Sequence, residues 1–173
     1  MDTDAFWSAR AQYYKDYNEI NTFPPTLTLA NMLEIHKAQD IIEIACASGI
    51  FSCHFLRNLP NAKTFTSMDV SEKMIELAKA RKATTEGINK EIQHEFVVGD
   101  AQDLSFIKDE SVDLCISNLG IHMFGDPDKF LQEAKRILKK GGKIGLSVPT
   151  RYDGFMELLR GGGQKNELFP SSP

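Results

Sequence analysis

Five short apolar runs alternate with helical patterns along most of the 173-residue chain, and this alternation limits the possible fold more than any other feature. The runs predict strands that read DIIEIAC (residues 40–46), KTFTSMDV (63–70), IQHEFVVGDA (92–101), SVDLCISNL (111–119) and KIGLSVP (143–149). Strands that are joined through helices lie parallel, with the helices covering both faces of the sheet. The sequence therefore predicts an α/β fold with a doubly wound, mostly parallel sheet of about five strands.

Residues with helix-terminal preferences predict where two of the helices begin and where one ends. Ser71 suits the N-cap of the helix after the second strand, and Asp126 followed by Pro127 is typical of a helix start. The helix that starts at Pro127 is expected to have Lys139 and Lys140 in its last turn, because the helix dipole favours cations there. We expect the next two residues, Gly141 and Gly142, to end this helix.

Composition divides the chain into three parts. We expect an N-terminal helical cap, a sheet domain that binds the ligand, and a flexible tail rich in glycine and proline; these span residues 1–38, 39–160 and 161–173. The cap is expected to be helical over residues 4–37, with an interruption at Pro24 and Pro25. The sheet domain is expected to end with a helix at residues 152–160.

Charge, targeting signals and cysteine spacing exclude several classes of function. The chain has 20 basic and 24 acidic residues, a net charge of −4 and no dense Lys/Arg cluster, so we expect no nucleic-acid partner. The N-terminus lacks the apolar core of a signal peptide, and no run approaches the ~20 apolar residues of a membrane span, so we expect a cytoplasmic protein. Cys46, Cys53 and Cys115 have neither metal-ligand nor disulfide-framework spacing, so we expect no metal site.

Small and polar residues follow four of the predicted strands. In a doubly wound sheet, ligands bind beyond the carboxyl ends of the strands, where the strand order reverses. The segments expected to meet there are residues 43–49, Asp69, residues 99–103 and residues 118–122. Asp69 ends the second strand 20 residues after Gly49, where a carboxylate accepts hydrogen bonds from the ribose hydroxyls of an adenosine. The alternative is that Asp69 only opens the turn before Ser71.

The turn after the first strand, EIACASG at residues 43–49, has small residues at every second position: Ala45, Ala47 and Gly49. A dinucleotide site would have the spacing Gly-x-Gly-x-x-Gly, whose glycines let the backbone approach a pyrophosphate. Because that spacing is absent, a nicotinamide-dependent oxidoreductase is poorly supported. The strand, turn and helix still form the usual place for a nucleotide-like ligand.

Taken in order along the chain, the motifs resemble those of the class I S-adenosylmethionine-dependent methyltransferases, above all the small-molecule group related to the ubiquinone and menaquinone biosynthesis enzymes. The first motif of that family runs acid-x-Gly/Ala-Cys-Gly-Thr/Ser-Gly and is similar to residues 43–49. The later motifs are similar to DVSEKMIELAKA (residues 69–80), GDAQDLSF (99–106) and DLCISNLGIHMFGDPDKFLQEAKRILKKGGKI (113–144). The resemblance covers roughly residues 7–149. It implies a Rossmann-like fold, S-adenosylmethionine as cofactor and methyl transfer to an unidentified small-molecule acceptor.

The resemblance also implies roles for individual residues. The cofactor-binding positions would be Glu43, Ala45, Cys46, Ala47 and Gly49 beside the methionine part, Asp69 on the ribose, Val70 or Met68 against the adenine, Asp100 and Ala101 on the adenine edge, and Asn118 beside the methionine end. Tyr14 or Tyr13 of the N-terminal cap would cover the cofactor, with core packing as an equally open alternative. His122 is the candidate catalytic base for an acceptor that must lose a proton, and the alternative is that it only lines the crevice.

Two features depart from the family pattern. Ala47 stands where the family usually has glycine. We expect its Cβ to crowd the cofactor or, if this position needs a positive φ, its backbone to be strained. The family sheet normally has seven strands, and too few residues follow Val148 for a helix and the last two strands. We therefore expect those strands to be missing and the fifth strand to be an exposed edge, open to a second copy or a partner chain. The alternative function is a non-catalytic methyltransferase-like domain that acts as a partner or regulatory subunit.

Overall fold

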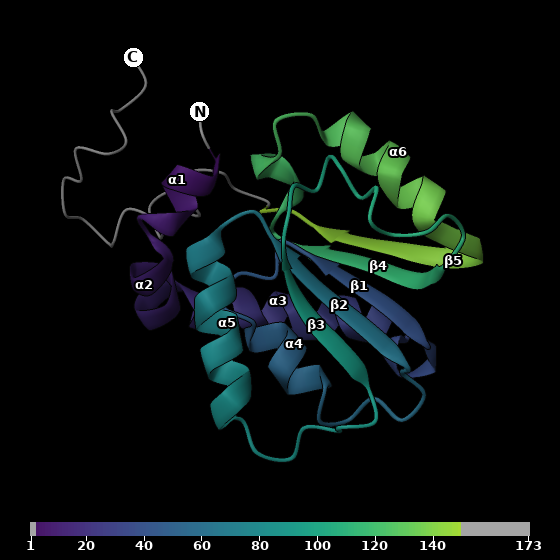
Figure 1. Cartoon of the computed structure of the whole chain (residues 1–173), viewed down its shortest axis with the longest axis horizontal. Helices are drawn as coiled ribbons and strands as arrows, with labels where there is room; N and C mark the ends of the chain where they lie inside the picture. The colour runs from purple at the N-terminus through teal and green to yellow at the C-terminus, as the bar shows by residue number, and fades with distance from the viewer. Residues whose placement is uncertain (1–2, 150–173) are drawn as a thin grey trace.

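The computed structural model describes residues 3–149, which form one five-stranded sheet between two layers of helices (Figure 1). The strands are β1 (Asp40–Ile44), β2 (Thr64–Asp69), β3 (Gln93–Val98), β4 (Val112–Asn118) and β5 (Leu138–Ser147). Their order across the sheet is β3-β2-β1-β4-β5, and every neighbouring pair is parallel. The order reverses at β1, because β2 lies on one side of it and β4 on the other. The α/β fold with a doubly wound parallel sheet of five strands is therefore confirmed.

Helices cover both faces of the sheet. Those of the described residues are α1 (Thr3–Ser8), α2 (Ala11–Tyr13), α3 (Glu19–Met32), α4 (Ile50–Phe55), α5 (Glu72–Thr84) and α6 (Pro127–Ile137), with a π-helical turn at Tyr14–Asn18 and 3₁₀ turns at Ile35–Lys37 and Ile121–Met123. Helices α3, α4 and α5 lie on one face and α6 lies on the other (Figure 1). Helices α1 and α2 contact α5, so the N-terminal segment is packed against the sheet domain.

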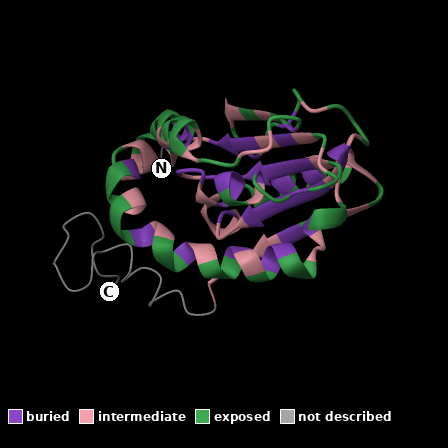
Figure 2. Cartoon of the chain, turned by 90° about the horizontal axis from the view of Figure 1, so that it is seen from below, coloured by how far each residue is buried: buried purple, intermediate pink, exposed green. Residues whose placement is uncertain are grey.

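Apolar side chains fill the space on each face of the sheet. Consecutive strand residues point to opposite faces, so Ile41 packs in the core under α3 and α4, whereas Ile42 packs in the core under α6. Both side chains are at most 2% exposed, and burial of such a side chain stabilises the fold by roughly 1.5–3 kcal/mol. Figure 2 shows the buried strands enclosed between the helical layers. Burial on both faces explains the apolar runs of β1 and β4.

The two N-caps expected from the sequence are confirmed. At the start of α5, Ser71 Oγ accepts a hydrogen bond from the N–H of Met74 at 3.2 Å. At the start of α6, Asp126 Oδ1 accepts from the N–H of Lys129 at 3.0 Å, and Pro127 is the first helical residue. Each cap satisfies a backbone donor that has no partner within its own helix. Helix α5 therefore begins directly after the carboxyl end of β2.

Pro24 and Pro25 do not interrupt the N-terminal helix, so that prediction is wrong. Both lie inside α3, which continues past them. A proline in a helix interior removes the hydrogen bond to the carbonyl four residues before it. The two carbonyls concerned belong to Ile20 and Asn21, which are exposed residues, so water can satisfy them. The irregular backbone lies earlier instead, in the π-helical turn Tyr14–Asn18.

The glycine pair does not end α6, which is a second correction. The helix stops at Ile137 and β5 begins at the next residue, so Gly141 and Gly142 lie within the strand. Gly141 has a φ of +82°, and β5 pairs irregularly with β4 in this region. A strand bulge with a left-handed residue favours glycine for the same reason as a helix C-cap does, because no Cβ is present to clash. The glycine pair therefore belongs to an irregularity in β5 and not to the C-cap of α6.

Lys139 and Lys140 are strand residues and not the C-terminal cations of a helix. The Nζ atom of Lys139 lies 2.7 Å from Asp40 Oδ2 and 2.9 Å from Asp113 Oδ1. Asp113 also accepts a hydrogen bond from the backbone N–H of Asp40 at 2.9 Å, through Oδ2. A cation is thus held between carboxylates near the amino ends of β1 and β4. This pairing places the segment in the sheet, and it joins residues 99 positions apart.

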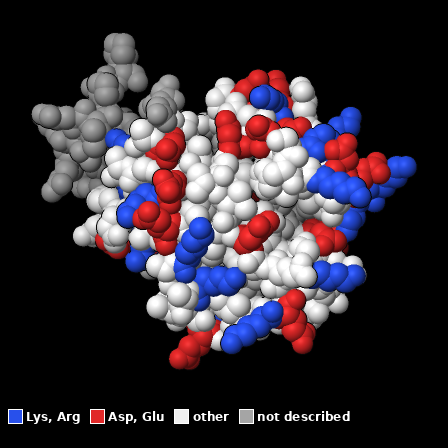
Figure 3. Space-filling view, viewed as in Figure 1, with Lys and Arg blue, Asp and Glu red and all other residues white. Residues whose placement is uncertain are grey.

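Two expectations, the helix at residues 152–160 and the tail at residues 161–173, lie outside the described residues. Within residues 3–149, no helix is long and apolar enough to cross a membrane. On the face shown in Figure 3, lysine and arginine side chains are interspersed with aspartate and glutamate side chains. Neither charge therefore forms a continuous surface on that face.

Candidate functional site

A cavity opens beyond the carboxyl ends of the strands, at the point where the strand order reverses. Small-molecule sites of open α/β sheets lie at this point. Nine of the residues expected from the sequence to bind a ligand line it: Tyr14, Ala45, Ala47, Met68, Asp69, Val70, Asp100, Ala101 and Asn118. Five others do not line it: Tyr13, Glu43, Cys46, Gly49 and His122. The fold thus brings together loops from four strands and part of the N-terminal segment.

Some of the cavity wall was not identified from the sequence. Trp7 and Thr22 line it from the N-terminal helices, and Met123 and Phe124 line it from the loop after β4. The position of Met123 and Phe124 just past a strand end was a usable signal. Trp7 and Thr22 lie in helical segments far from any strand, where an aromatic or hydroxyl residue is usually part of ordinary packing. Their role as cavity wall follows only from the packing of the helices over the sheet.

The turn between β1 and α4 has a left-handed backbone at every second residue. The φ angle is +59° at Ala45, +48° at Ala47 and +73° at Gly49. A residue with a Cβ is less stable in this conformation by roughly 1–2 kcal/mol, so the two alanines hold a strained turn. Gly49 has a further constraint, because a Cβ there would lie 2.8 Å from the Cβ of Ala78 in α5. The alternating small residues of the sequence are explained by this alternation of backbone conformation.

Asp69 joins the first turn to the second. Its Oδ2 accepts a hydrogen bond from the N–H of Ala47, and its Oδ1 accepts one from the N–H of Ser71, each at 2.9 Å. Each carboxylate oxygen can accept another hydrogen bond, and the residue lines the cavity. Burial raises the pKa of Asp69 to about 6, although the two N–H donors favour the charged form. Asp69 therefore does support the turn before Ser71, and it also has acceptor capacity left for a ligand.

The loop after β3 contributes Asp100 and Ala101. Asp100 is exposed, and its Oδ1 accepts hydrogen bonds from the backbone N–H and the side-chain amide of Gln102, both at 2.9 Å. Ala101 is buried and packs in the core under α6. The loop starts at Gly99, where a Cβ would lie 2.9 Å from the Sδ of Met68. One accessible carboxylate and one closely packed backbone segment thus face the same cavity.

Asn118, at the end of β4, ties the N-terminal helices to the sheet. Its Nδ2 donates to the carbonyl of Thr22 at 3.0 Å, and its Oδ1 accepts from Ser147 Oγ at 2.7 Å. Ser147 Oγ also accepts a hydrogen bond from the N–H of Leu119 at 3.0 Å. The side chain of Asn118 is therefore hydrogen-bonded to α3 and to β5. The predicted contact between its backbone carbonyl and a cofactor stays a prediction.

Of the two tyrosines considered from the sequence, Tyr14 faces the cavity. It lines the wall, shares a 2.8 Å hydrogen bond with the hydroxyl of Thr22, and has its ring centre 6.1 Å from that of Trp7. Burial is the main cause that raises the pKa of Tyr14 to about 12, so the phenol stays protonated at neutral pH. Tyr13 is 38% exposed and lies against the ring of Tyr17. Tyr14 is thus the tyrosine that is placed to cover a ligand.

Glu43 lies behind the turn and not in the cavity wall. It is buried, and its Oε2 accepts a hydrogen bond from Ser52 Oγ at 2.5 Å. Ser67 Oγ donates to Ser52 Oγ at 3.0 Å and shares a 3.0 Å hydrogen bond with His94 Nε2. Burial and, to a smaller extent, the charge of Asp69 raise the pKa of Glu43 to about 8. The carboxyl group is therefore mostly neutral at pH 7, and it would affect a ligand through the turn.

His122 and Cys46 do not line the cavity either. His122 belongs to the 3₁₀ turn Ile121–Met123, and burial lowers its pKa, which keeps the imidazole neutral at pH 7. Burial raises the pKa of the Cys46 thiol well above its usual range, which disfavours the reactive thiolate. Across the part of the chain that the structure describes, no group of His, Cys, Asp and Glu side chains is arranged to hold a metal ion.

Known proteins share this sequence pattern. Residues 42–146 match the family model described as a methyltransferase domain. The chain is 28% identical over 147 residues to malonyl-[acyl-carrier protein] O-methyltransferase 1 of Ilyobacter polytropus, covering 82% of this chain and 50% of the relative. It is 32% identical over 128 residues to demethylmenaquinone methyltransferase of Bacteroides fragilis, and this match covers 72% of this chain and 49% of the relative. The chain thus spans about half the length of these curated relatives.

A solved structure from Methanococcus maripaludis has the same fold. It aligns with a TM-score of 0.70, and the alignment covers 91% of this chain and 72% of that chain. The sequence identity is 23%, so the likeness concerns the fold alone. The parallel sheet with its flanking helices is therefore an arrangement that a crystallographically determined protein also has.

Proposed function

We propose, since the chain belongs to the methyltransferase-domain family, that it binds S-adenosylmethionine in the cavity and transfers the methyl group to a small organic acceptor. The family model covers residues 42–146, which is more than half of the 173 residues. The curated relatives are named for methyl transfer to two different acceptors. This similarity therefore supports the type of reaction and leaves the acceptor open.

One observation, the placement of Asp69, carries the cofactor assignment. A ribose presents two neighbouring hydroxyl donors, and a carboxylate at the end of the second strand can accept from both. The N–H groups of Ala47 and Ser71 hold the Asp69 carboxylate from behind, each at 2.9 Å. The remaining acceptor positions are on a residue that lines the cavity. A fixed carboxylate of this kind needs little reorganisation when the ribose binds.

The other parts of the cofactor are assigned to the neighbouring loops. We assign Val70, Asp100 and Ala101 to the adenine and Ala45, Ala47 and Asn118 to the methionine end. S-adenosylmethionine supplies a methyl group that its positively charged sulfur has already activated. The chain then has to hold the acceptor in line with that group and to exclude water. Trp7 and Tyr14 line the cavity from the N-terminal helices and would serve that second purpose.

Proton removal matters only for an acceptor with a proton on its reacting atom. We retain His122 as the candidate base, because burial lowers its pKa and keeps it neutral, and because its neighbour Met123 lines the cavity. Tyr14 is not suited to this role, since its pKa is raised to about 12. A His122→Asn variant should lower kcat for such an acceptor and leave cofactor affinity unchanged. An unchanged kcat would remove His122 from the mechanism.

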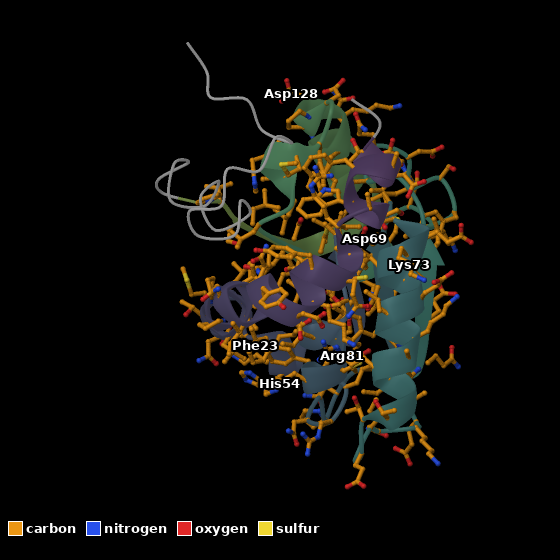
Figure 4. The ribbon with its side chains drawn as sticks, turned by 90° about the vertical axis from the view of Figure 1, so that its left-hand side faces the viewer. Phe23, His54, Asp69, Lys73, Arg81 and Asp128 are labelled. Atoms are coloured by element: carbon orange, nitrogen blue, oxygen red, sulfur yellow. The ribbon has the colours of Figure 1, made fainter. Side chains whose placement is uncertain are left out.

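Calorimetric titration with S-adenosylhomocysteine tests the cofactor assignment. We expect a dissociation constant in the micromolar range, or about −8 kcal/mol of binding free energy. Asp69→Asn should weaken binding by roughly 10-fold or more, because hydrogen bonds to a charged group contribute about 1.5–3 kcal/mol. Asp128→Asn is the matched control, since Asp128 is an exposed residue in the first turn of α6 (Figure 4). Failure of the unmodified chain to bind at millimolar concentration would refute the proposal.

A non-catalytic partner subunit is the second candidate function. Two observations favour it: Ala45 and Ala47 strain the turn, and β5 pairs only with β4 within residues 3–149. Turnover can be assayed with demethylmenaquinone and malonyl-acyl carrier protein, the acceptors named for the curated relatives. Methyl transfer by a chain that sediments as a monomer would exclude this candidate. Cofactor-free dimers without turnover would support it.

A further inference from the structure

A charged network outside the cavity holds the turn between β1 and α4. Arg81 of α5 donates from Nη2 to both carboxylate oxygens of Glu19, the first residue of α3, at 2.6 Å each. Arg81 Nε also donates to the backbone carbonyl of Ser48 at 2.9 Å. The hydroxyl of Ser48 donates to Glu19 Oε2. Figure 4 shows Arg81 between α5 and the N-terminal helices. This network thus contacts the turn at one residue, Ser48, through both its side chain and its backbone.

The network is shielded from water, which makes it stronger than a typical surface ion pair. The side chains of Arg81 and Glu19 are 22% and 14% exposed, and Ser48 is fully buried. Exposed ion pairs contribute little to stability, whereas hydrogen bonds that involve a charged partner and are partly desolvated contribute more. None of the three residues lines the cavity. Their effect on a ligand would therefore have to pass through the turn.

The chain offers a short path for that effect. Ser48 lies between Ala47 and Gly49, which are both left-handed, with φ of +48° and +73°. A strained backbone persists only where its surroundings determine it. The N–H of Ala47 then donates to Asp69 at 2.9 Å. A change at Ser48 would thus alter the direction of the N–H that orients the carboxylate in the cavity wall.

We propose that Glu19 and Arg81 are positioning residues for the cofactor: they hold Ser48 and so keep the alanine-containing turn in its left-handed form, which presents Ala47 and Asp69 to the ligand. This inference rests on the proposed function, because the ligand in question is S-adenosylmethionine. It makes the N-terminal segment part of the binding site although Glu19 does not touch the cavity. It also explains how this turn can contain alanines, since the network offsets the preference of Ala47 for another backbone conformation.

A double-mutant cycle between the network and the turn tests the proposal. Glu19→Gln should weaken S-adenosylhomocysteine binding about 10-fold, within the range of 5–150-fold that is typical of coupling between sites. The same substitution in an Ala47→Gly background should weaken binding several-fold less, because glycine adopts the left-handed form without support. Glu76→Gln is the control, since it breaks an exposed ion pair with Lys73 on the same helix and should leave affinity unchanged.

Calorimetry and urea denaturation of each variant separate positioning from stability. A merely structural ion pair would lower the free energy of unfolding and leave the affinity of the folded protein unchanged, which would overturn the inference. An equal loss of affinity in both backgrounds would also overturn it. If Glu19→Gln does not fold, Ser48→Ala removes only one hydroxyl and should show the same dependence on the background. Failure of the unmodified chain to bind the ligand would instead refute the proposed function, and with it this inference.

Discussion

Replacing Ala47 by glycine tests the strained turn most directly. Its φ is +48°, a conformation in which a Cβ is unfavourable by roughly 1–2 kcal/mol. Glycine also has more conformational freedom in the unfolded chain, which offsets about 0.4–1 kcal/mol of that gain. Ala47 is half-buried in the cavity wall, so removing its methyl group leaves no closed void. We therefore expect Ala47→Gly to raise the free energy of unfolding by about 0.5–1 kcal/mol.

The assay is urea denaturation of the cofactor-free protein, with an unchanged m-value as evidence that the comparison is valid. A gain of this size corresponds to an increase in Tm of about 1–4 °C for a chain of this length. Ala80→Gly is the matched control, because Ala80 is exposed inside α5, where glycine should cost about 1 kcal/mol. The two substitutions should have opposite signs. If Ala47→Gly destabilised the fold as much as Ala80→Gly does, the account of a strained left-handed turn would be refuted.

Three further outcomes are expected. Because the pKa of Asp69 is raised to about 6 and its charged form accepts the ribose hydroxyls, S-adenosylhomocysteine affinity should fall as the pH drops through 6; titrations at pH 5 and 7.5 with equal affinity would contradict this. The pKa of Glu43 is raised to about 8 in the folded state, so its contribution to stability is fully present below its unfolded value of about 4.5 and is lost as the pH rises through 8. In urea denaturation, the free energy of unfolding of the unmodified chain should fall by a few kcal/mol, on the order of 2–4, between pH 5 and 9, and Glu43→Gln should abolish this fall. If the pH profile of the variant equals that of the unmodified chain, Glu43 does not titrate in this range. Tyr14→Phe should lower stability by about 0.5–1.5 kcal/mol through its lost hydrogen bond to Thr22, and calorimetry should show little change in affinity because the ring remains.

The edges of helices and strands show how far local patterns can be trusted. Ser71 and Asp126 were identified as caps because a cap is made within a few residues of the helix it starts. Gly141 was assigned to the wrong element, because a positive φ is required both at a helix end and in a strand bulge. Two residues earlier, Lys139 of the same strand is held by Asp40 and Asp113, which are distant in sequence. No local pattern contains that information.

The cavity shows the same division between local and distant information. The position of Asp69 at the end of a strand, 20 residues after Gly49, was enough to expect it in the crevice, and it lines the cavity. Glu43 follows the same logic in sequence, yet its side chain turns to Ser52 behind the wall. Successive residues of a strand point to opposite faces of the sheet. The surroundings of a strand side chain therefore depend on which helix packs on its face, and a local sequence pattern does not contain that information.

The sequence alone determined the alternation of strands and helices, the parallel sheet and the edge where a ligand would bind, because hydrophobic periodicity and strand-end residues are local properties. Only the tertiary structure decided which distant side chains meet. The pair Glu19 and Arg81 is separated by 62 residues, and the contact between Thr22 and Asn118 spans 96. Such contacts form when helices pack on a sheet, and each charged residue had many possible partners before that packing. The left-handed alanine turn is local in sequence, but the contacts that stabilise it are not.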